Sequence, residues 1–93
     1  MRRIERTSQF KRDYRRELKG RHRTSLDAVL VPLLVGSAND QPLESRYHDH
    51  ALSGEWKEFR DCHLKPDLVL IYQKQATDKL RLVRLGSHSE LGL

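Results

Sequence analysis

The sequence is poor in cysteine and tryptophan, with one of each, and it has no long apolar run. A single cysteine, Cys62, cannot form an internal disulfide, as expected for a protein of the reducing cytoplasm. No apolar stretch approaches the roughly 20 residues of a transmembrane helix. The N-terminal residues also lack the apolar core of a secretory signal. The sequence therefore predicts a cytoplasmic protein with no membrane partner.

The chain is predicted to form one globular domain, residues 1–93, because 37% of its residues are apolar and 33% are charged. The net charge of +5 is unevenly distributed. Residues 1–23 hold ten Lys and Arg against three Asp and Glu, whereas residues 24–93 hold eight against ten. A basic block of this kind indicates a polyanionic partner, most often a nucleic acid, although a solvated helix face has the same composition.

A short strand is expected within residues 2–7, followed by a first helix. Thr7 or Ser8 is expected to cap the start of this helix, and Gly20 its end. The helix should bury a stripe of apolar residues at i, i+4 and i+8 spacing, which are Phe10, Tyr14 and Leu18.

A second helix is expected after a cap at Thr24 or Ser25, because apolar residues recur at helical spacing over residues 26–34. Pro32 should kink this helix or end it early, since proline removes a backbone hydrogen bond. Gly36 should stop it. The short connection between the two helices predicts an antiparallel helix hairpin.

The C-terminal half is expected to form a meander of three strands after a long connection at residues 36–54. The expected strands are residues 55–63, 68–72 and 80–85. The second of them is almost wholly apolar, as in a central strand covered on both faces. The predicted order is β-α-α-β-β-β, an α+β fold with a helix hairpin packed on a small, mainly antiparallel sheet.

Titratable side chains recur where the backbone is expected to turn. His50 lies in the long connection, and His88 follows the last strand. His63 and Asp67 flank the turn between the first two C-terminal strands. Histidine exchanges protons near neutral pH, so these residues are candidates for acid–base catalysis, although a single loop histidine is more often a surface residue.

A metal site is the main alternative for these residues, because His48, His50, Cys62 and His63 include plausible zinc ligands. Zinc sites usually have two ligand pairs at short spacings and more than one cysteine. His48 and His50 are also expected to point to opposite sides of an extended segment. The sequence therefore favours a protein without a metal or other cofactor.

The motifs of the C-terminal half, taken together and in order, resemble the YafQ-type branch of the RelE toxin superfamily. They are Asp49-His50-Ala51-Leu52, Gly54, Trp56, Arg60-Asp61-Cys62-His63, Pro66-Asp67, Leu70-Ile71-Tyr72 and Gly86-Ser87-His88-Ser89-Glu90-Leu91. Two positions depart from the family's pattern. Leu68 stands where some members have Trp, and Gly92 follows Leu91 where members often have Phe.

The resemblance implies the RelE-like fold and the toxin of a type II toxin–antitoxin pair. Such toxins are metal-independent endoribonucleases that cut mRNA, usually in the ribosomal A site. Their partners are mRNA, the ribosome and a cognate antitoxin that is typically acidic, partly disordered and DNA-binding. Carried over to this chain, the catalytic residues are His50, His63, Asp67 and His88, with Arg84 supporting the scissile phosphate.

Cleavage of RNA without a metal requires a base for the 2′-hydroxyl, an acid for the leaving oxygen and a cation for the phosphoryl charge. The implied residues supply these groups, but the sequence does not assign base and acid. Further basic residues are candidates for RNA binding, and they are Arg60, Arg81, Lys11, Arg15 and Lys19. The alternative is a non-catalytic RNA- or ribosome-binding protein on the same fold, suggested by the missing aromatic after Leu91.

Overall fold

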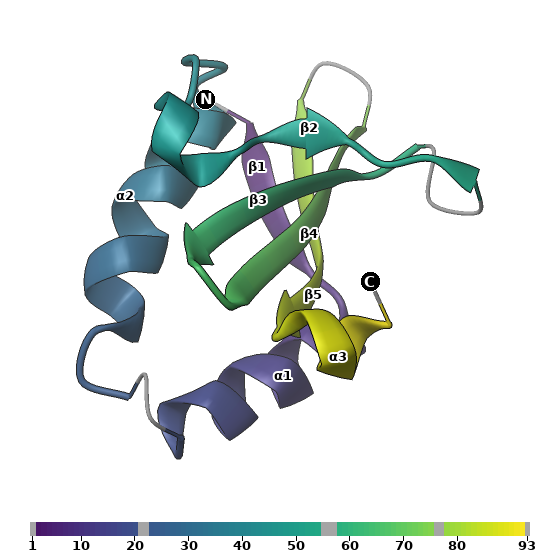
Figure 1. Cartoon of the computed structure of the whole chain (residues 1–93). Coiled ribbons are helices and arrows are strands. Elements are labelled where there is room, and N and C mark those ends of the chain that lie inside the picture. The colour runs from purple at the N-terminus through teal and green to yellow at the C-terminus, as the bar shows by residue number, and fades with distance from the viewer. Residues whose placement is uncertain (1, 21–22, 55–57, 76–77, 93) are drawn as a thin grey trace.

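The computed structural model describes residues 2–20, 23–54, 58–75 and 78–92. Its helices and strands are β1 (Arg3–Arg6), α1 (Ser8–Leu18), α2 (Leu26–Ala38), the 3-10 helix η1 (Ser45–Tyr47), β2 (His50–Ala51), β3 (Arg60–Lys65), β4 (Leu68–Gln75), β5 (Lys79–Gly86) and α3 (His88–Leu91). The strands form one five-stranded sheet in the order β1-β5-β4-β3-β2 (Figure 1). Among the strands of the described ranges, only β1 and β5 pair in parallel, so the predicted α+β fold with a mainly antiparallel sheet is confirmed.

The main core lies between one face of the sheet and helices α1 and α2. Leu70 and Leu82 of the sheet pack there against residues that include Phe10 of α1 and Leu30 of α2. A smaller cluster on the opposite face joins Val69 and Ile71 to Leu91 of α3. β4 is therefore covered on both faces, as its apolar run predicts. No helix in the described ranges is long and apolar enough to cross a membrane.

Helix α1 begins where the sequence predicts and ends earlier. The Thr7 hydroxyl accepts a hydrogen bond from the backbone N–H of Phe10, so Thr7 is the N-cap. The helix ends at Leu18, and Lys19 caps it in the right-handed helical conformation. The predicted role of Gly20 as the cap is wrong, because this end does not use a left-handed residue.

Helix α2 runs past both of its expected breaks, Pro32 and Gly36, and reaches Ala38. Pro32 and Ala28 are exposed, so water can reach the carbonyl of residue 28 that the proline leaves without a helical partner. Leu30 and Leu33 hold the helix against the core on either side of the proline. Tertiary packing therefore outweighs the local helix-breaking signals.

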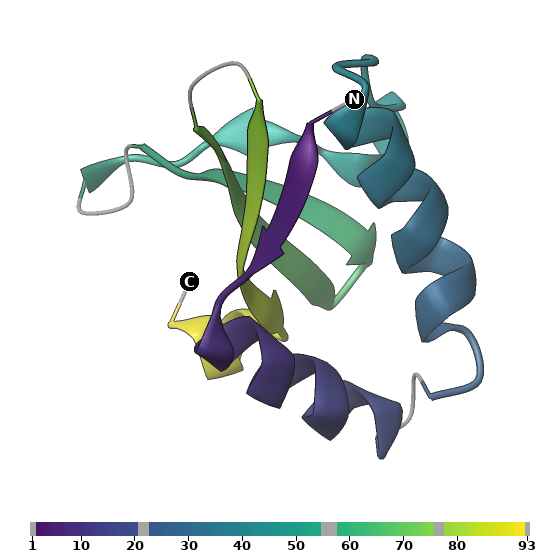
Figure 2. The ribbon, with the colours of Figure 1, turned by 180° about the vertical axis from the view of Figure 1, so that it is seen from behind.

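The two helices cover the same face of the sheet, but they do not lie side by side. Figures 1 and 2 show α1 beneath one end of the sheet and α2 along its side, at a steep angle to each other. The expected close antiparallel hairpin is therefore wrong in geometry, although its place on the sheet is correct. Tyr14 of α1 reaches α2 through a hydrogen bond from its hydroxyl to the carboxylate of Asp27.

Side chains of helix α1 bind the part of the β5 edge that β1 does not cover. β1 pairs with β5 only as far as Leu82. Beyond that point Asp13 accepts a hydrogen bond of 3.0 Å from the backbone N–H of Leu85, and Arg16 donates one of 2.7 Å to the carbonyl of the same residue. These two side chains satisfy backbone groups that no strand reaches.

The C-terminal region differs from prediction at its boundaries. β3 extends from Arg60 to Lys65, two residues beyond the expected end. Residues 55–57, including the motif residue Trp56, lie outside the described residues. β4 continues to Gln75, and a short helix, α3, follows β5 where only a tail was expected. Ser87 and Glu90 form a capping box at the start of α3.

Candidate active site

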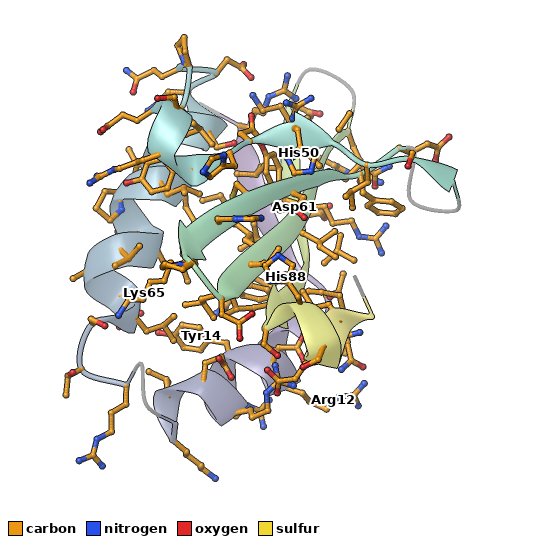
Figure 3. All side chains as sticks on the ribbon, viewed as in Figure 1. Arg12, Tyr14, His50, Asp61, Lys65 and His88 are labelled. Atoms are coloured by element: carbon orange, nitrogen blue, oxygen red, sulfur yellow. The ribbon has the colours of Figure 1, made fainter. Side chains whose placement is uncertain are left out.

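Four histidines gather on the sheet face opposite α1 and α2. His63 of β3 is at their centre, with its ring centroid 5.0 Å from that of His88, 5.5 Å from that of His48 and 6.4 Å from that of His50. They come from four separate places in the chain: the end of η1, β2, β3 and the start of α3. Figure 3 labels two of them, His50 and His88. We call these four residues the histidine cluster.

The alternation of β3 places His63 on this face. Cys62 and Leu64 belong to the core beneath the helices, so Asp61 and His63 point the other way. His50 of β2 is paired in register with Asp61, which brings it to the same face. Alternation of side chains along the strand accounts for this division of β3.

Asp49 anchors the segment that carries His48 and His50. Its carboxylate accepts two hydrogen bonds from Arg60, at 3.1 and 3.2 Å, and a third from the hydroxyl of Tyr72. Burial and this hydrogen bond raise the pKa of Tyr72. The exposed segment is thereby attached to β3 and β4, the most buried part of the sheet.

His48 and His50 do not point to opposite sides, as expected for an extended segment. His48 caps η1 with φ of 49°, in the left-handed region, and the turn directs its ring toward His63. The carbonyl of His48 also lies within hydrogen-bond distance of the His50 Nδ1. The extended geometry assumed from the sequence is wrong here, because the chain turns between the two residues.

Asp67 orients His88. Its Oδ1 lies 3.0 Å from Nδ1 of the His88 ring and 3.2 Å from the His88 backbone nitrogen, which donates to it. A carboxylate at Nδ1 favours the tautomer with the proton on that nitrogen, and it leaves Nε2 for a reacting group. The structure therefore brings two of the sequence-predicted site residues, Asp67 and His88, into direct contact.

Asp61 belongs to the candidate site, although it is not among the residues that the sequence predicts there. Only 4% of its surface is exposed, and its Oδ1 lies 3.4 Å from Nε2 of His63 without the geometry of a hydrogen bond. Burial lowers the pKa of His63, the negative charge of Asp61 opposes that shift, and the other three histidines add to it. The i, i+2 spacing of Asp61 and His63 on one strand was the signal that could have revealed this pair.

Arg84 shares the sheet face of the histidine cluster, but its guanidinium turns toward α1. It is paired in register with Ile71, which is paired with Asp61, so the Cα atoms of Arg84 and Asp61 are about 10 Å apart. Its Nε donates to the buried carboxylate of Asp13 at 2.8 Å. The structure thus places Arg84 beside the cluster with its charge already paired.

The other candidate RNA-binding residues lie outside the cluster. Arg60 is held by Asp49, and Arg81 is exposed on β5. Lys11 and Arg15 of α1 line a separate small hollow, and Lys19 is exposed just beyond the end of that helix. The structure therefore does not bring the basic block of α1 together with the histidines.

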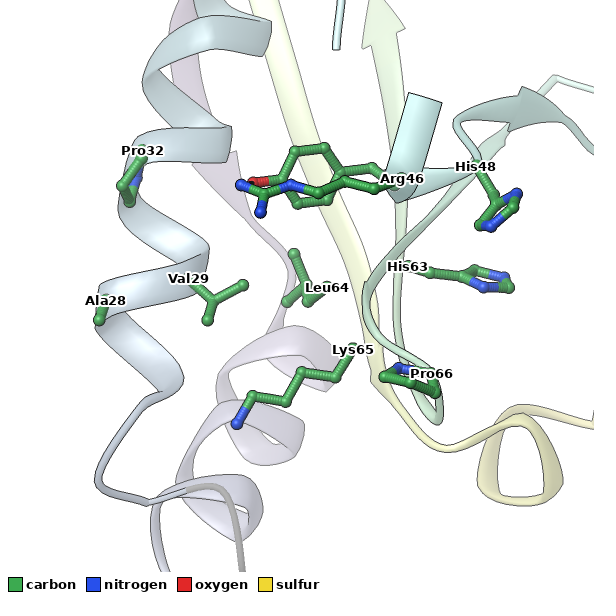
Figure 4. A pocket seen from close by; sticks show the side chains of 10 residues that line it. Ala28, Val29, Pro32, Arg46, His48, His63, Leu64, Lys65 and Pro66 are labelled. Atoms are coloured by element: carbon green, nitrogen blue, oxygen red, sulfur yellow. Dashed lines mark hydrogen bonds between the residues drawn. The ribbon is translucent and has the colours of Figure 1, made fainter. Parts of the chain in front are cut away.

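A cleft of about 650 Å³ opens beside the cluster, between α2 and the end of β3 (Figure 4). Its lining residues are Ala28, Val29, Pro32, Arg46, Tyr47, His48, His63, Leu64, Lys65 and Pro66. Two of them, His48 and His63, also belong to the histidine cluster. This cleft cannot be inferred from sequence patterns, because its walls are far apart in the chain.

Within the part of the chain that the structure describes, no three His, Cys, Asp or Glu residues are arranged to hold a metal ion. Cys62 is fully buried in the core, and burial raises the pKa of its thiol far above the usual range. Its side chain is therefore a neutral apolar group and not a nucleophile. What the arrangement offers chemically is proton transfer among imidazoles and carboxylates.

A family described as "Bacterial toxin of type II toxin-antitoxin system, YafQ" matches residues 2–92. The mRNA interferase toxin YafQ of Escherichia coli strain K12 is 40% identical over 89 residues, which cover 95% of this chain and 92% of that protein. A copper-bound mutant toxin from Helicobacter pylori has a TM-score of 0.87 and 39% identity, covering 98% of this chain and 99% of that one. A chain of the E. coli DinJ-YafQ complex has a TM-score of 0.78 and 36% identity, covering 98% of both.

Proposed function

The chain belongs to the YafQ family of bacterial toxins of type II toxin–antitoxin systems, and from this premise we propose that it is a metal-independent, ribosome-dependent mRNA endoribonuclease. The observation that carries the proposal is the contact of His63 with His88, one imidazole beside Asp61 and the other beside Asp67. Two adjacent imidazoles with separate carboxylates can serve as a base and an acid in one reaction.

His63 is the base in this proposal. Its pKa is lowered, chiefly by burial, so the ring is neutral at physiological pH and can accept the proton of the 2′-hydroxyl. The 2′-oxygen then attacks the adjacent phosphorus, and the bond from phosphorus to the 5′-oxygen breaks. The products are a 2′,3′-cyclic phosphate and a 5′-hydroxyl. DNA lacks the 2′-hydroxyl and is not cleaved.

His88 is the acid, which donates a proton from Nε2 to the leaving 5′-oxygen. Asp67 fixes its tautomer and lies next to the positive charge that the ring carries before transfer. His50, at the exposed side of the cluster, is proposed to bind the substrate near the reacting 2′-hydroxyl. Proton transfer by two positioned groups contributes roughly 10²–10⁴-fold each to such a reaction.

Arg84 is proposed to support the charge of the phosphoryl group. Its side chain is about a quarter exposed, on the sheet face of the cluster, and Asp13 fixes the guanidinium by accepting from Nε. A guanidinium held on one side can still present its other donors to an oxyanion. Asp13 is thus proposed to act as a positioning residue for Arg84.

The partners in this proposal are a translating ribosome with its mRNA and a cognate antitoxin, as the E. coli DinJ-YafQ complex suggests. We propose that the protein acts in the cytoplasm, where both are found. The antitoxin is expected to be acidic and partly disordered when free, because such a segment complements a toxin with a net charge of +5.

Primer extension on mRNA in a translating extract tests the proposal. The wild-type protein should create new 5′-ends within codons. It should do so equally well when bound metal has first been removed from the toxin with EDTA. His88→Ala should abolish them, whereas Ser89→Ala, on the exposed side of the same helix, should not. Cleavage of naked RNA would refute ribosome dependence, and no cleavage by folded wild-type protein would favour the non-catalytic binding function.

A further inference from the structure

We propose that the cleft between α2 and β3 binds the nucleotide that adjoins the scissile phosphate, which rests on the RNA cleavage proposed above. The base would lie against the apolar wall of the cleft, and the cations Arg46 and Lys65 would bind the flanking phosphates. The cleft would then be the place where the toxin holds its substrate in register with the histidines.

The cleft and the histidine cluster are continuous. His48 and His63 line the cleft, and their ring centroids are 5.5 Å apart. A phosphodiester positioned at His63 for attack carries its next nucleotide on a single sugar–phosphate link. That nucleotide must therefore lie close to the cluster, and the adjoining hollow of about 650 Å³ is within the size range of sites for small ligands.

The edge of β3 forms one wall of this cleft. The pairing of β2 with β3 ends at Asp61, so the following residues of β3 face α2 across the open space (Figure 4). Backbone donors and acceptors along a strand edge can bind phosphate oxygens and the edges of bases. The edge of β3 thus lacks a neighbouring described strand at the point where the substrate would enter.

The charge of the cleft favours an anion. Among the described residues, ten line the cleft and none of these ten is acidic, although the chain holds 13 Asp and Glu. Lys65 extends along the cleft and donates a hydrogen bond to the hydroxyl of Ser25. Arg46 lies over the ring of Tyr47 at 4.9 Å, and its ion pair with Glu44 is exposed on both sides, which makes it weak.

The rest of the lining is suited to a base. Val29 and Pro32 on the α2 side and Leu64 and Pro66 on the sheet side are apolar. Apolar and aromatic walls accept any base by stacking or contact, and such contacts need no particular hydrogen-bond pattern. We therefore expect the cleft to contribute affinity and register, with little preference for sequence.

The first experiment fills the cleft. Affinity is measured by fluorescence anisotropy with a labelled eight-nucleotide RNA analogue. Its 2′-deoxy sugars lack the attacking hydroxyl, so the analogue cannot be cleaved. Ala28→Trp places an indole on the cleft side of α2, and it should weaken binding about tenfold, the loss expected when one base loses its contact surface. Val31→Trp is the matched control, because Val31 is exposed on the same helix and does not line the cleft.

The second experiment tests the charges. Lys65→Gln and Arg46→Gln should each reduce the slope of log affinity against log salt by about 0.7, the value for one lost phosphate contact on a single strand. Lys74→Gln, which removes an equal charge outside the cleft, should leave the slope unchanged. A structural role alone would not change this slope.

Equal affinities for Ala28→Trp and Val31→Trp, or equal slopes for Lys65→Gln and Lys74→Gln, would overturn the proposal for the cleft while leaving RNA cleavage intact. Loss of antitoxin binding in Ala28→Trp with unchanged RNA binding would also overturn it, because the cleft would then be a protein interface. If the wild type bound RNA in the cleft but created no new 5′-ends on mRNA in the translating extract, the proposed catalysis would fail and the nucleotide site would remain.

Discussion

The proton affinity of His63 depends on neighbours that act in opposite directions. Burial lowers its pKa, the carboxylate of Asp61 raises it, and His88, His48 and His50 lower it further. Asp61 is itself buried beside the ring, so its charge is poorly screened by solvent. A single carboxylate therefore limits how far the other groups depress this pKa.

Asp61→Asn should move the pH dependence of cleavage. The substitution removes the charge that favours protonated His63, so the pKa of the ring falls further and the acidic limb of the pH–rate profile shifts to lower pH. The profile of cleavage rate against pH and the titration of the His63 ring by NMR should shift together. A pH–rate profile that did not follow the titration of the ring would contradict the assignment of His63 as the base, and a titration that moved toward higher pH would contradict the effect of the Asp61 charge.

The candidate catalytic residues can be identified from sequence motifs, whereas the residues that surround them cannot. His50, His63, Asp67 and His88 were identified through the motifs, and the fold brings all four to one face. Asp61 was overlooked because a strand carboxylate usually faces solvent. The position of His48 depends on a left-handed turn, and such a conformation of a non-glycine residue cannot be read from local sequence.

Short helix α3 depends on its capping box to hold His88 in place. The Ser87 hydroxyl accepts from the backbone N–H of Glu90, and the Glu90 carboxylate accepts from the backbone N–H of Ser87. Ser87→Ala should lower the free energy of unfolding by about 1 kcal/mol and reduce cleavage by loosening His88. Thermal unfolding and primer extension measure the two effects. Ser87→Asp, which keeps an N-cap acceptor, should recover most of both, and its failure to do so would argue against the capping role.

Asp13 connects α1 to β5 and to Arg84. Burial alone would raise its pKa, but hydrogen bonds from Arg84 and from the backbone of Leu85 outweigh that effect and lower it. Asp13→Ala should cost about 3 kcal/mol of stability at neutral pH, because it leaves the Arg84 charge and a buried backbone N–H without this partner. Urea unfolding of Asp13→Ala, Arg84→Ala and the double variant gives the coupling.

The pH dependence of this contribution has a definite sign. A carboxyl whose pKa is lowered on folding binds more protons in the unfolded chain, so its contribution is complete above about pH 4 and is lost as the pH falls further. The stability difference between wild type and Asp13→Asn should therefore shrink in acid. A difference that stayed constant down to pH 2 would show that the carboxylate is not the stabilising form.

The elements themselves were largely predictable, since apolar periodicity identified both long helices and all three C-terminal strands. The errors have physical causes. Gly36 was expected to end α2, but its neighbours Ser37 and Ala38 are buried, so packing extends the helix. The capping-box pattern of Ser87 and Glu90 was present in the sequence and would have predicted α3.

Stability should be unevenly distributed over the whole molecule. β4 is the central strand of the sheet, and residues 68–72 are buried, whereas the two residues of β2 are exposed at its edge. Native-state hydrogen exchange should find the slowest amides in β4 and the adjoining part of β5, and the fastest in η1 and β2. Equal protection of β2 and β4 would show that the Asp49 network makes the edge part of the global unit.

The parallel pairing of the first and last strands determines when the protein can fold during its synthesis on the ribosome. Thr7 hydrogen-bonds to the carbonyl of Val83, 76 residues later in the chain, and His88 lies beyond that strand. A growing chain therefore has neither a partner for β1 nor a complete histidine cluster until β5 and α3 have been synthesised and have emerged. The proposed nuclease activity can therefore arise only after the ribosome has synthesised the last residue of the site, so the nascent polypeptide cannot cleave the mRNA that encodes it before that point.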